Sequence, residues 1–178
     1  MEALSNIEVI LLSIVNEKPS YAYEIDKTIN LRDMRRWVRI GVASIYQALK
    51  KLEEKGLVYS KKEKEGRMPV RKRYYVTERG REALVEASKR LLSSLEWYYV
   101  DLNVGLEASD LLTPGEIASC LSKRLDIVQA NKKRLKEMYR NASDAAFKKK
   151  TVIKNLLYFR EAEERFLREL FQEMSNNN

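Results

Sequence analysis

Residues 116–178 contain neither glycine nor proline, and this run constrains the fold more than any other feature of the 178-residue chain. It is rich in Lys, Glu, Leu and Arg, which are good helix formers, so it predicts long α-helices. Six of the nine glycines and prolines lie in the first 80 residues, where they predict shorter elements joined by turns. We therefore expect a mainly α protein built in two different ways along its length.

The first 80 residues predict three helices followed by a β-hairpin. The expected helices cover residues 4–16, a segment capped by Ser20 that contains Ile25 and Ile29, and residues 43–55, which Gly56 ends. The expected strands are 57–60 and 73–76, on either side of the basic segment 61–72. Thr77 caps a further helix that is expected to run to about Asn103. This order predicts a winged helix-turn-helix with a two-stranded wing, in which the third helix is the reader.

The positive charge is concentrated on the predicted reader and wing. Residues 31–73 hold 14 Lys and Arg against five Asp and Glu, a net charge of +9, whereas the whole chain carries +8. Nucleic-acid binding needs such concentration, because neutralised phosphates release counterions. A charge run can also be no more than a solvated face. Together with the order of the elements, the charge favours nucleic acid.

The third helix divides into an inner and an outer face. If Ile45, Leu49 and Leu52 point inward, polar side chains face a groove, and Gln47 can pair with adenine through two hydrogen bonds. Tyr46 can reach a phosphate oxygen, although a half-buried packing role is the alternative. The predicted DNA-binding residues are Arg39, Ser44, Tyr46, Gln47, Lys50 and Lys51, and in the wing Lys61, Lys62, Lys64, Arg67, Arg71 and Lys72.

About the first 85 residues resemble the PadR-like winged helix transcriptional regulators. The matching stretches are Pro19–Ile25, Ala43–Leu49, Leu52–Glu53, Gly56–Val58, Gly66–Arg67, Arg71–Thr77, Gly80–Arg81 and Leu84. The resemblance implies a dimeric DNA-binding regulator, usually a repressor, without catalytic activity. It also implies that Tyr46 is the family's reader tyrosine and that Arg71 and Lys72 are the basic pair at the base of the wing.

The chain departs from the family pattern at two positions. Ala22 stands where the family usually has glycine, and Gln47 stands where proline often follows the reader tyrosine. Gln47 is therefore expected to alter the base preference. The long C-terminal part is similar, in length and helical pattern, to the subgroup with an extended helical C-terminal domain.

The second half predicts a helical dimerisation domain. Apolar residues after Thr77 follow alternating steps of four and three, the spacing of a coiled-coil seam. The expected dimer-interface residues are Leu84, Leu91, Leu95, Tyr98 and Leu102. Two further amphipathic helices follow, the first capped by Thr113 and the second expected to bury Phe166 among its apolar residues. They need partners, which a homodimer supplies, the alternative being a bundle within a monomer. We expect a winged helix-turn-helix domain over 1–80, a linker and dimer helix over 81–106, and a helical dimerisation domain over 107–178.

The remaining features bound the function. Trp97 and Trp37 are candidates for the pocket of a small aromatic effector, the alternative for each ring being core packing. The chain has no His, a single Cys at position 120 and no phosphate-binding glycine loop, so we expect no enzyme, no metal and no cofactor. It shows no pattern of a secretory signal or membrane span, so we expect a cytoplasmic protein. The rival to a DNA-binding regulator is a winged helix used as a protein-interaction module.

Overall fold

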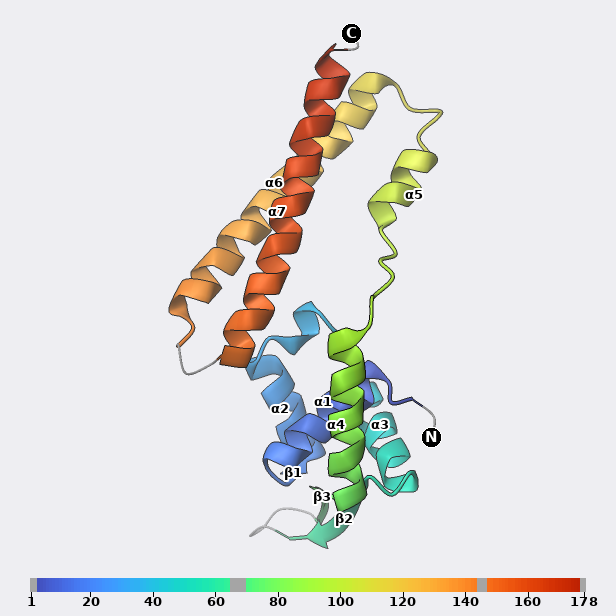
Figure 1. Ribbon diagram of the computed structural model, residues 1–178, viewed down its shortest axis with the longest axis vertical. Helices are drawn as coiled ribbons and strands as arrows, with labels where there is room; N and C mark the ends of the chain where they lie inside the picture. The colour runs from blue at the N-terminus through green and yellow to red at the C-terminus, as the bar shows by residue number, and fades with distance from the viewer. Residues whose placement is uncertain (1–2, 65–69, 144–146, 177–178) are drawn as a thin grey trace. The chain divides into compact units, whose positions relative to one another are not determined.

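The chain folds into two compact units, residues 1–97 and 98–178. Figure 1 shows the computed structural model, which describes residues 3–64, 70–143 and 147–176. The first unit holds helices α1 to α4 around a small sheet, and the second holds α5, α6 and α7. The expected fold class is confirmed: the protein is mainly α, with a winged helix-turn-helix followed by long helices.

Three helices build the core of the first unit. They are α1 (Asn6–Glu17), α2 (Ala22–Leu31) and α3 (Val42–Glu54), with the short 3₁₀ helix η1 (Met34–Arg36) between the last two. Helix α1 begins with a capping box, in which the Ser5 N–H donates to the Glu8 carboxylate and the Glu8 N–H donates to the Ser5 hydroxyl. The inner faces of α1 and α3 meet through fully buried leucines and isoleucines.

Glu8 is a buried acid, and its charge is paired. Its carboxylate accepts a hydrogen bond of 2.6 Å from the Lys55 ammonium at the end of α3. Burial opposes ionisation, but the bonds from Lys55 and Ser5 outweigh it, so the pKa of Glu8 lies below its ordinary value. The pair ties the start of α1 to the end of α3.

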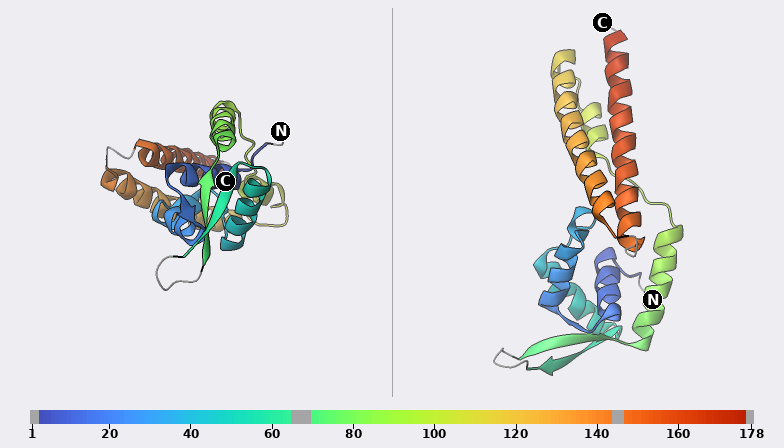
Figure 2. Two further views of the ribbon diagram at one scale, coloured as in Figure 1. Left: turned by 90° about the horizontal axis from the view of Figure 1, so that it is seen from below. Right: turned by 90° about the vertical axis from the view of Figure 1, so that its left-hand side faces the viewer.

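The sheet has three antiparallel strands in the order β1-β3-β2. Strands β2 (Val58–Glu63) and β3 (Arg71–Val76) form the expected hairpin (Figure 2), and both extend further into the basic segment than predicted. The third strand, β1 (Ser20–Tyr21), was not expected. Ser20 is therefore not the cap of α2: its hydroxyl donates to the Lys18 carbonyl, and the helix begins after Tyr21, whose N–H donates to Glu24.

Two glycines fix the junction between the reader helix, the wing and α4 (Glu78–Ser93). Gly56 has φ +67°, and the bonds from the Gly56 and Leu57 N–H groups to Glu53 and Leu52 close α3 in a Schellman motif, so the expected stop is confirmed. Gly80 is buried on α4, where an added Cβ would overlap the Leu57 carbonyl oxygen and lie 2.9 Å from Val76. Only glycine lets α4 approach the strand this closely.

Helix α4 ends earlier than the sequence analysis expected. Thr77 caps it as predicted, by accepting from the Gly80 N–H, but the helix stops at Ser93 and residues 95–100 are irregular. The expectation of one helix to Asn103 is wrong. Among the described residues little covers the segment beyond Ser93, since Leu95 and Tyr99 are 86% and 96% exposed, so packing does not stabilise a longer helix. The expected seam is divided accordingly, and it is not one continuous helical stripe.

The five residues of that seam have different surroundings. Leu84 and Leu91 pack against the core of the first unit, and Leu102 packs against the core of the second. Leu95 and Tyr98 lie in the irregular segment, where Tyr98 contacts Phe159 edge-to-face with 5.4 Å between ring centroids. Their assignment to a dimer interface stays a prediction.

The second unit is an α-helical hairpin with one short extra helix. Helices α6 (Pro114–Asn141) and α7 (Phe147–Asn176) lie side by side (Figure 1), after α5 (Asp101–Glu107). The expected cap is confirmed: Thr113 and Glu116 form a capping box with Pro114 at the first helical position. Leu121, Val128 and Leu167 form the core, whereas Phe166, which was expected inside, is 44% exposed. At this point of α7 the buried position is therefore Leu167 and not Phe166.

Glu164 is the central buried acid of the hairpin. It pairs with Lys132 of α6 and with Arg168 one turn along α7. These two bonds, Lys132 first, lower the pKa of Glu164 to about 2. Arg124 of α6 pairs with the adjacent Glu163 at 2.6 Å, so two charged contacts set the register of the helices.

Gly80→Ala is expected to destabilise the first unit by about 1–3 kcal/mol, because α4 must move away from Leu57. Gly105→Ala is the matched control, since no atom lies within 4 Å of the added Cβ there. Denaturant unfolding of both variants measures the difference in unfolding free energy. Equal stability of the two variants would contradict the close approach at Gly80.

Candidate nucleic-acid interface

The reader helix α3 buries one face and exposes the other. Ile45, Leu49 and Leu52 are fully buried, as expected. Tyr46 is 55% exposed, and Gln47, Lys50 and Lys51 are exposed beside it, while Ser44 is half-buried. Lys50 makes only an exposed contact of 3.7 Å with Glu54, which is worth little. The outer face of α3 therefore presents a phenol, an amide and two ammonium groups to solvent.

The pairing register separates the candidate cations of the wing onto two faces of the sheet. Lys62 lies directly opposite Lys72, and Lys61 lies opposite Arg73 in the next register position. Because successive side chains of a strand point to opposite faces, Lys62 and Lys72 share one face and Lys61, Arg71 and Arg73 share the other. Like charges directly opposite each other are unfavourable. On this face the Lys72 ammonium bonds to Glu53 at 3.2 Å, whereas Lys62 is exposed and makes no ion pair within the described residues.

The face with Lys62 and Lys72 is tied to the reader helix by Glu53 of α3. The Glu53 carboxylate accepts from the Ser60 hydroxyl at 2.5 Å and from the Lys72 ammonium at 3.2 Å. The hydrogen bond from Ser60, and after it the bond from Lys72, lowers the pKa of Glu53. The bond to Glu53 in turn raises the pKa of Lys72. Glu53 thereby holds the base of the wing against the last turn of α3.

The opposite face of the sheet is an array of tyrosines and cations centred on Glu63. Tyr75 donates to the Glu63 carboxylate at 2.5 Å and Tyr21 donates to it at 3.4 Å, while Arg73 pairs with it at 3.4 Å. The bond to Glu63 raises the pKa of Tyr75. Glu63 thus binds side chains of β1 and β3 to β2.

Aromatic rings position the cations of this face. The Arg71 guanidinium lies 5.0 Å from the centre of the Tyr23 ring, and that ring stacks on Tyr21. The Lys61 ammonium lies 5.4 Å from the centre of the Tyr75 ring. Sequence reasoning missed Tyr21, Tyr23 and Arg73 as parts of this surface. The alternation of Arg71, Arg73 and Tyr75 along the strand was the available signal.

The basic stretch before the reader helix is largely neutralised. Arg32 pairs with Glu17 at 2.5 Å, Arg35 pairs with Asp26 at 2.6 Å, and Arg36 pairs with Asp33 at 3.5 Å. Arg39 is exposed and makes no ion pair within the described part of the chain. The net charge of residues 31–73 thus overstates the charge available to a partner. Among the wing candidates, Lys64 is exposed, and Arg67 lies outside the described residues.

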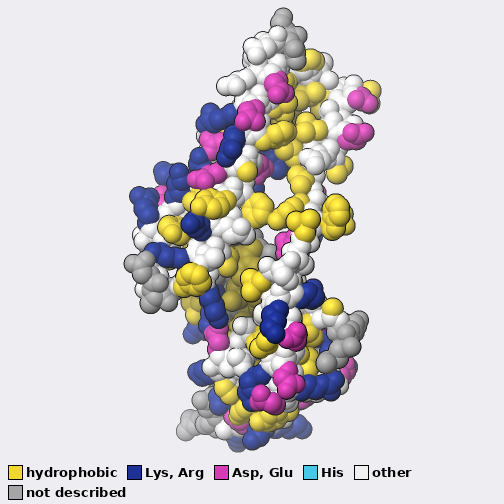
Figure 3. All heavy atoms as spheres, viewed as in Figure 1, with side chains coloured by type: hydrophobic (Ala, Val, Ile, Leu, Met, Phe, Trp, Pro, Cys, Tyr) yellow, Lys and Arg dark blue, Asp and Glu magenta, His cyan; other side chains and the backbone are white. Residues whose placement is uncertain are grey.

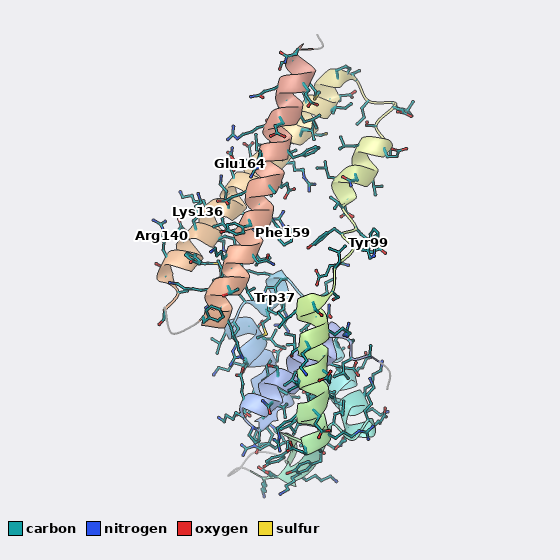
Figure 4. All side chains as sticks on the ribbon, in the orientation of Figure 1. Trp37, Tyr99, Lys136, Arg140, Phe159 and Glu164 are labelled. Atoms are coloured by element: carbon teal, nitrogen blue, oxygen red, sulfur yellow. The ribbon has the colours of Figure 1, made fainter. Side chains whose placement is uncertain are left out.

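The two tryptophans lie in different settings. Trp37 follows η1 and is 39% exposed, and Trp97 is 85% exposed in the irregular segment after α4. Core packing, the alternative considered for Trp97, is therefore wrong within this chain. Figure 4 labels Trp37, and it labels Tyr99 in the same irregular segment as Trp97. The first unit also has a groove, which is lined by the N-terminal segment, the end of α3 and α4. Neither tryptophan lines this groove.

Comparison with known families matches the part of the chain that holds the predicted reader and wing. Residues 11–86 match the model of the "Transcriptional regulator PadR-like family". These residues belong to the PadR-like family. The match covers α1 to the first half of α4, and so includes all the predicted DNA-binding residues.

Solved PadR-like structures match almost the whole chain. Bacillus subtilis PadR in complex with operator DNA has a TM-score of 0.81 at 17% identity, covering 96% of this chain and 99% of that one. Bacillus subtilis PadR in complex with p-coumaric acid has a TM-score of 0.77 at 16% identity, over 95% and 98% of the two chains. The PadR-like regulator BC1756 from Bacillus cereus has 0.66 at 16%, over 97% and 100%. The likeness is one of fold, and it extends to the C-terminal hairpin.

The chain was also compared with curated proteins, and its described residues were examined for membrane-spanning helices and metal-binding groups. No curated protein matches the chain significantly. Among residues 3–64, 70–143 and 147–176, no helix is long and apolar enough to cross a membrane. Over the same residues, no group of three His, Cys, Asp or Glu side chains is placed to hold a metal ion.

Proposed function

We propose that this PadR-like protein is a sequence-specific DNA-binding regulator that acts in the cytoplasm as a repressor, as a homodimer on an inverted repeat. The observation that supports this most is the outer face of α3, whose Tyr46, Gln47 and Lys50 are exposed beside a wing that Glu53 ties to the same helix. Bacillus subtilis PadR, whose fold matches, was crystallised with operator DNA. Within the described residues, Lys62 on one face of the wing and Lys61 and Arg71 on the other make no ion pair. A protein-interaction module with this fold would not need such cations on both faces.

Binding to DNA upstream of the protein's own gene is expected to weaken steeply with salt. Each neutralised phosphate contributes about 0.9 to the slope of log affinity against log salt. Gel-shift titrations at rising salt, with random duplex as the competitor, measure both the slope and the preference. Affinity that does not respond to salt would favour the protein-interaction module.

Two variants separate base reading from phosphate binding. Gln47→Ala is expected to lower specific affinity by about 1–3 kcal/mol and to relax the preference for one base pair. Arg71→Ala is expected to weaken all duplexes alike and to lower the salt slope by about 1. Lys27→Ala, on the exposed side of α2, is the control and should change neither quantity. Equal effects of Gln47→Ala on every sequence would contradict a reading role.

The second unit supplies the argument for a homodimer. Its hairpin leaves large apolar side chains uncovered, among them Ile127 at 69% exposed and Phe159 at 42%. Exposed apolar surface of this kind marks an interaction site. An inverted repeat requires two readers related by a two-fold axis, and pairing of two hairpins would supply that symmetry.

The double variant Ile127→Glu, Phe159→Glu is expected to shift the protein from dimer to monomer. Each new carboxylate would have to be buried in the dimer interface without a cation to pair with, which costs free energy. Asn155→Glu, at an exposed polar position of α7, is the control and should leave the dimer intact. Light scattering at micromolar concentration measures the mass. A wild-type chain that is monomeric under these conditions would contradict the homodimer.

We also propose that a small aromatic effector binds near Trp97 and weakens DNA binding. Trp97 and Tyr99 are exposed in the segment that joins α4 to α5. Residues 91–122 contain five Asp and Glu and no Lys or Arg, so this segment favours a cationic aromatic molecule. Bacillus subtilis PadR was crystallised with an aromatic acid, p-coumaric acid. The test therefore compares an aromatic cation with an aromatic acid.

Titration with a flat aromatic cation is expected to quench tryptophan emission more than p-coumaric acid does. Trp97→Phe should lose the response, whereas Trp37→Phe should keep it. A coupling of about 1–3 kcal/mol would lower operator affinity about 5–150-fold at saturation. If neither compound changes emission or releases DNA, Trp97 is not part of an effector site.

A further inference from the structure

The end of the α6–α7 hairpin carries a second concentration of positive charge. Residues 132–154 contain nine Lys and Arg against two Asp and Glu, a net charge of +7. The rest of α7, residues 155–176, holds three Arg against five Glu, so the hairpin is strongly polarised along its length. Figure 3 shows dark-blue side chains gathered over the C-terminal half of α6 and the start of α7.

Five of these cations are exposed in the C-terminal part of α6 and at the start of α7, and we call them the hairpin-end patch. It consists of Lys133, Lys136 and Arg140 on α6 and Lys148 and Lys149 on α7. The α6 members are three and four residues apart, so they lie on one helical face over about 10 Å. Figure 4 labels Lys136 and Arg140 on this stretch of α6, with Glu164 on α7. All five are exposed, and none makes an ion pair within the described residues.

Several other cations of the hairpin have partners. Lys132 and Arg168 pair with Glu164, Arg124 pairs with Glu163, and Lys154 lies 5.6 Å from the centre of the Tyr158 ring. The pairs of Lys132 with Glu164 and of Arg124 with Glu163 join α6 to α7. The hairpin-end patch makes no such pair within the described residues, and its five positive charges repel one another. Its charge is therefore available to an anionic partner.

We propose that the hairpin-end patch binds the phosphate backbone of duplex DNA without reading its sequence. A row of Lys and Arg along one helical face is suited to a polyanion, since each neutralised phosphate releases a counterion. An acidic protein is the less favoured partner, because Lys is depleted at the centre of protein–protein interfaces. The choice of DNA as the polyanion rests on the proposed function; the surface itself lies outside the predicted reader and wing.

The test replaces all five cations in the full-length protein: Lys133→Gln, Lys136→Gln, Arg140→Gln, Lys148→Gln and Lys149→Gln. On a long random duplex, between about 50 and 200 mM salt, the slope of log affinity against log salt is expected to fall by up to about 4.5. The matched control removes five exposed cations elsewhere: Lys18→Gln, Lys27→Gln, Lys89→Gln, Lys123→Gln and Arg165→Gln. The control has the same net charge and should keep the wild-type slope.

A second measurement locates the patch on DNA. A hydroxyl-radical-generating label on the thiol introduced by Lys136→Cys, in a Cys120→Ser background, should cut bound duplex, and the same label on native Cys120 should cut it less. Position 136 lies about 24 Å further along α6. Circular dichroism of the five-fold variant verifies that the hairpin is folded.

The outcomes separate this inference from the proposed function. A patch variant with the wild-type salt slope, or one that changes only the mass in light scattering, overturns DNA binding by the patch in favour of an acidic protein or a second copy. A lower slope together with an unchanged ratio of operator to random affinity supports it. If wild type shows no sequence preference but the patch variant still loses slope, the proposed reader function fails and the patch stands.

Discussion

The packing of the apolar face of α3 on α1 is the constraint on which the rest of the first unit depends. Ile45, Leu49 and Leu52 are fully buried, and that burial determines which residues of α3 face outward. Gly56 then ends the helix, and the next residue, Leu57, lies so close to Gly80 that α4 must cross there. The directions of the reader face, the wing and α4 thus follow from one packed helix and two glycines.

Charge performs two separable tasks in this protein. Buried or half-buried acids hold elements together: Glu8 joins α1 to α3, Glu53 joins α3 to the wing, and Glu164 joins α7 to α6. Other cations, such as Lys51 on α3, Lys62 on the wing and Lys136 at the end of the hairpin, are exposed and make no ion pair within the described residues. A count of net charge along the sequence adds these two classes together, although only the second is available to a partner.

Local patterns in the sequence predicted the elements that local chemistry determines. The reader helix was placed within one residue at each end, and the caps Gly56, Thr77 and Thr113 were correctly assigned. Non-local contacts were missed: the two residues of β1 become a strand only because β3 passes beside them. The helix expected to run to Asn103 ends at Ser93 for a related reason: the spacing of apolar residues continues, but the described part of the chain leaves Leu95 largely exposed. The ion pairs of Arg32 and Arg35 also depend on residues of α1 and α2 that spacing alone does not place.

Selection of binding sites from a random duplex pool tests the central claim most directly, because it requires the reader, the wing and the dimer to act together. The account predicts enrichment of an inverted repeat whose half-site centres are about 34 Å apart, or a multiple of that distance. It also predicts that the Gln47→Ala protein enriches a repeat with one position relaxed in each half-site. Recovery of no shared sequence, or of single unpaired half-sites by a protein that remains dimeric, would contradict it.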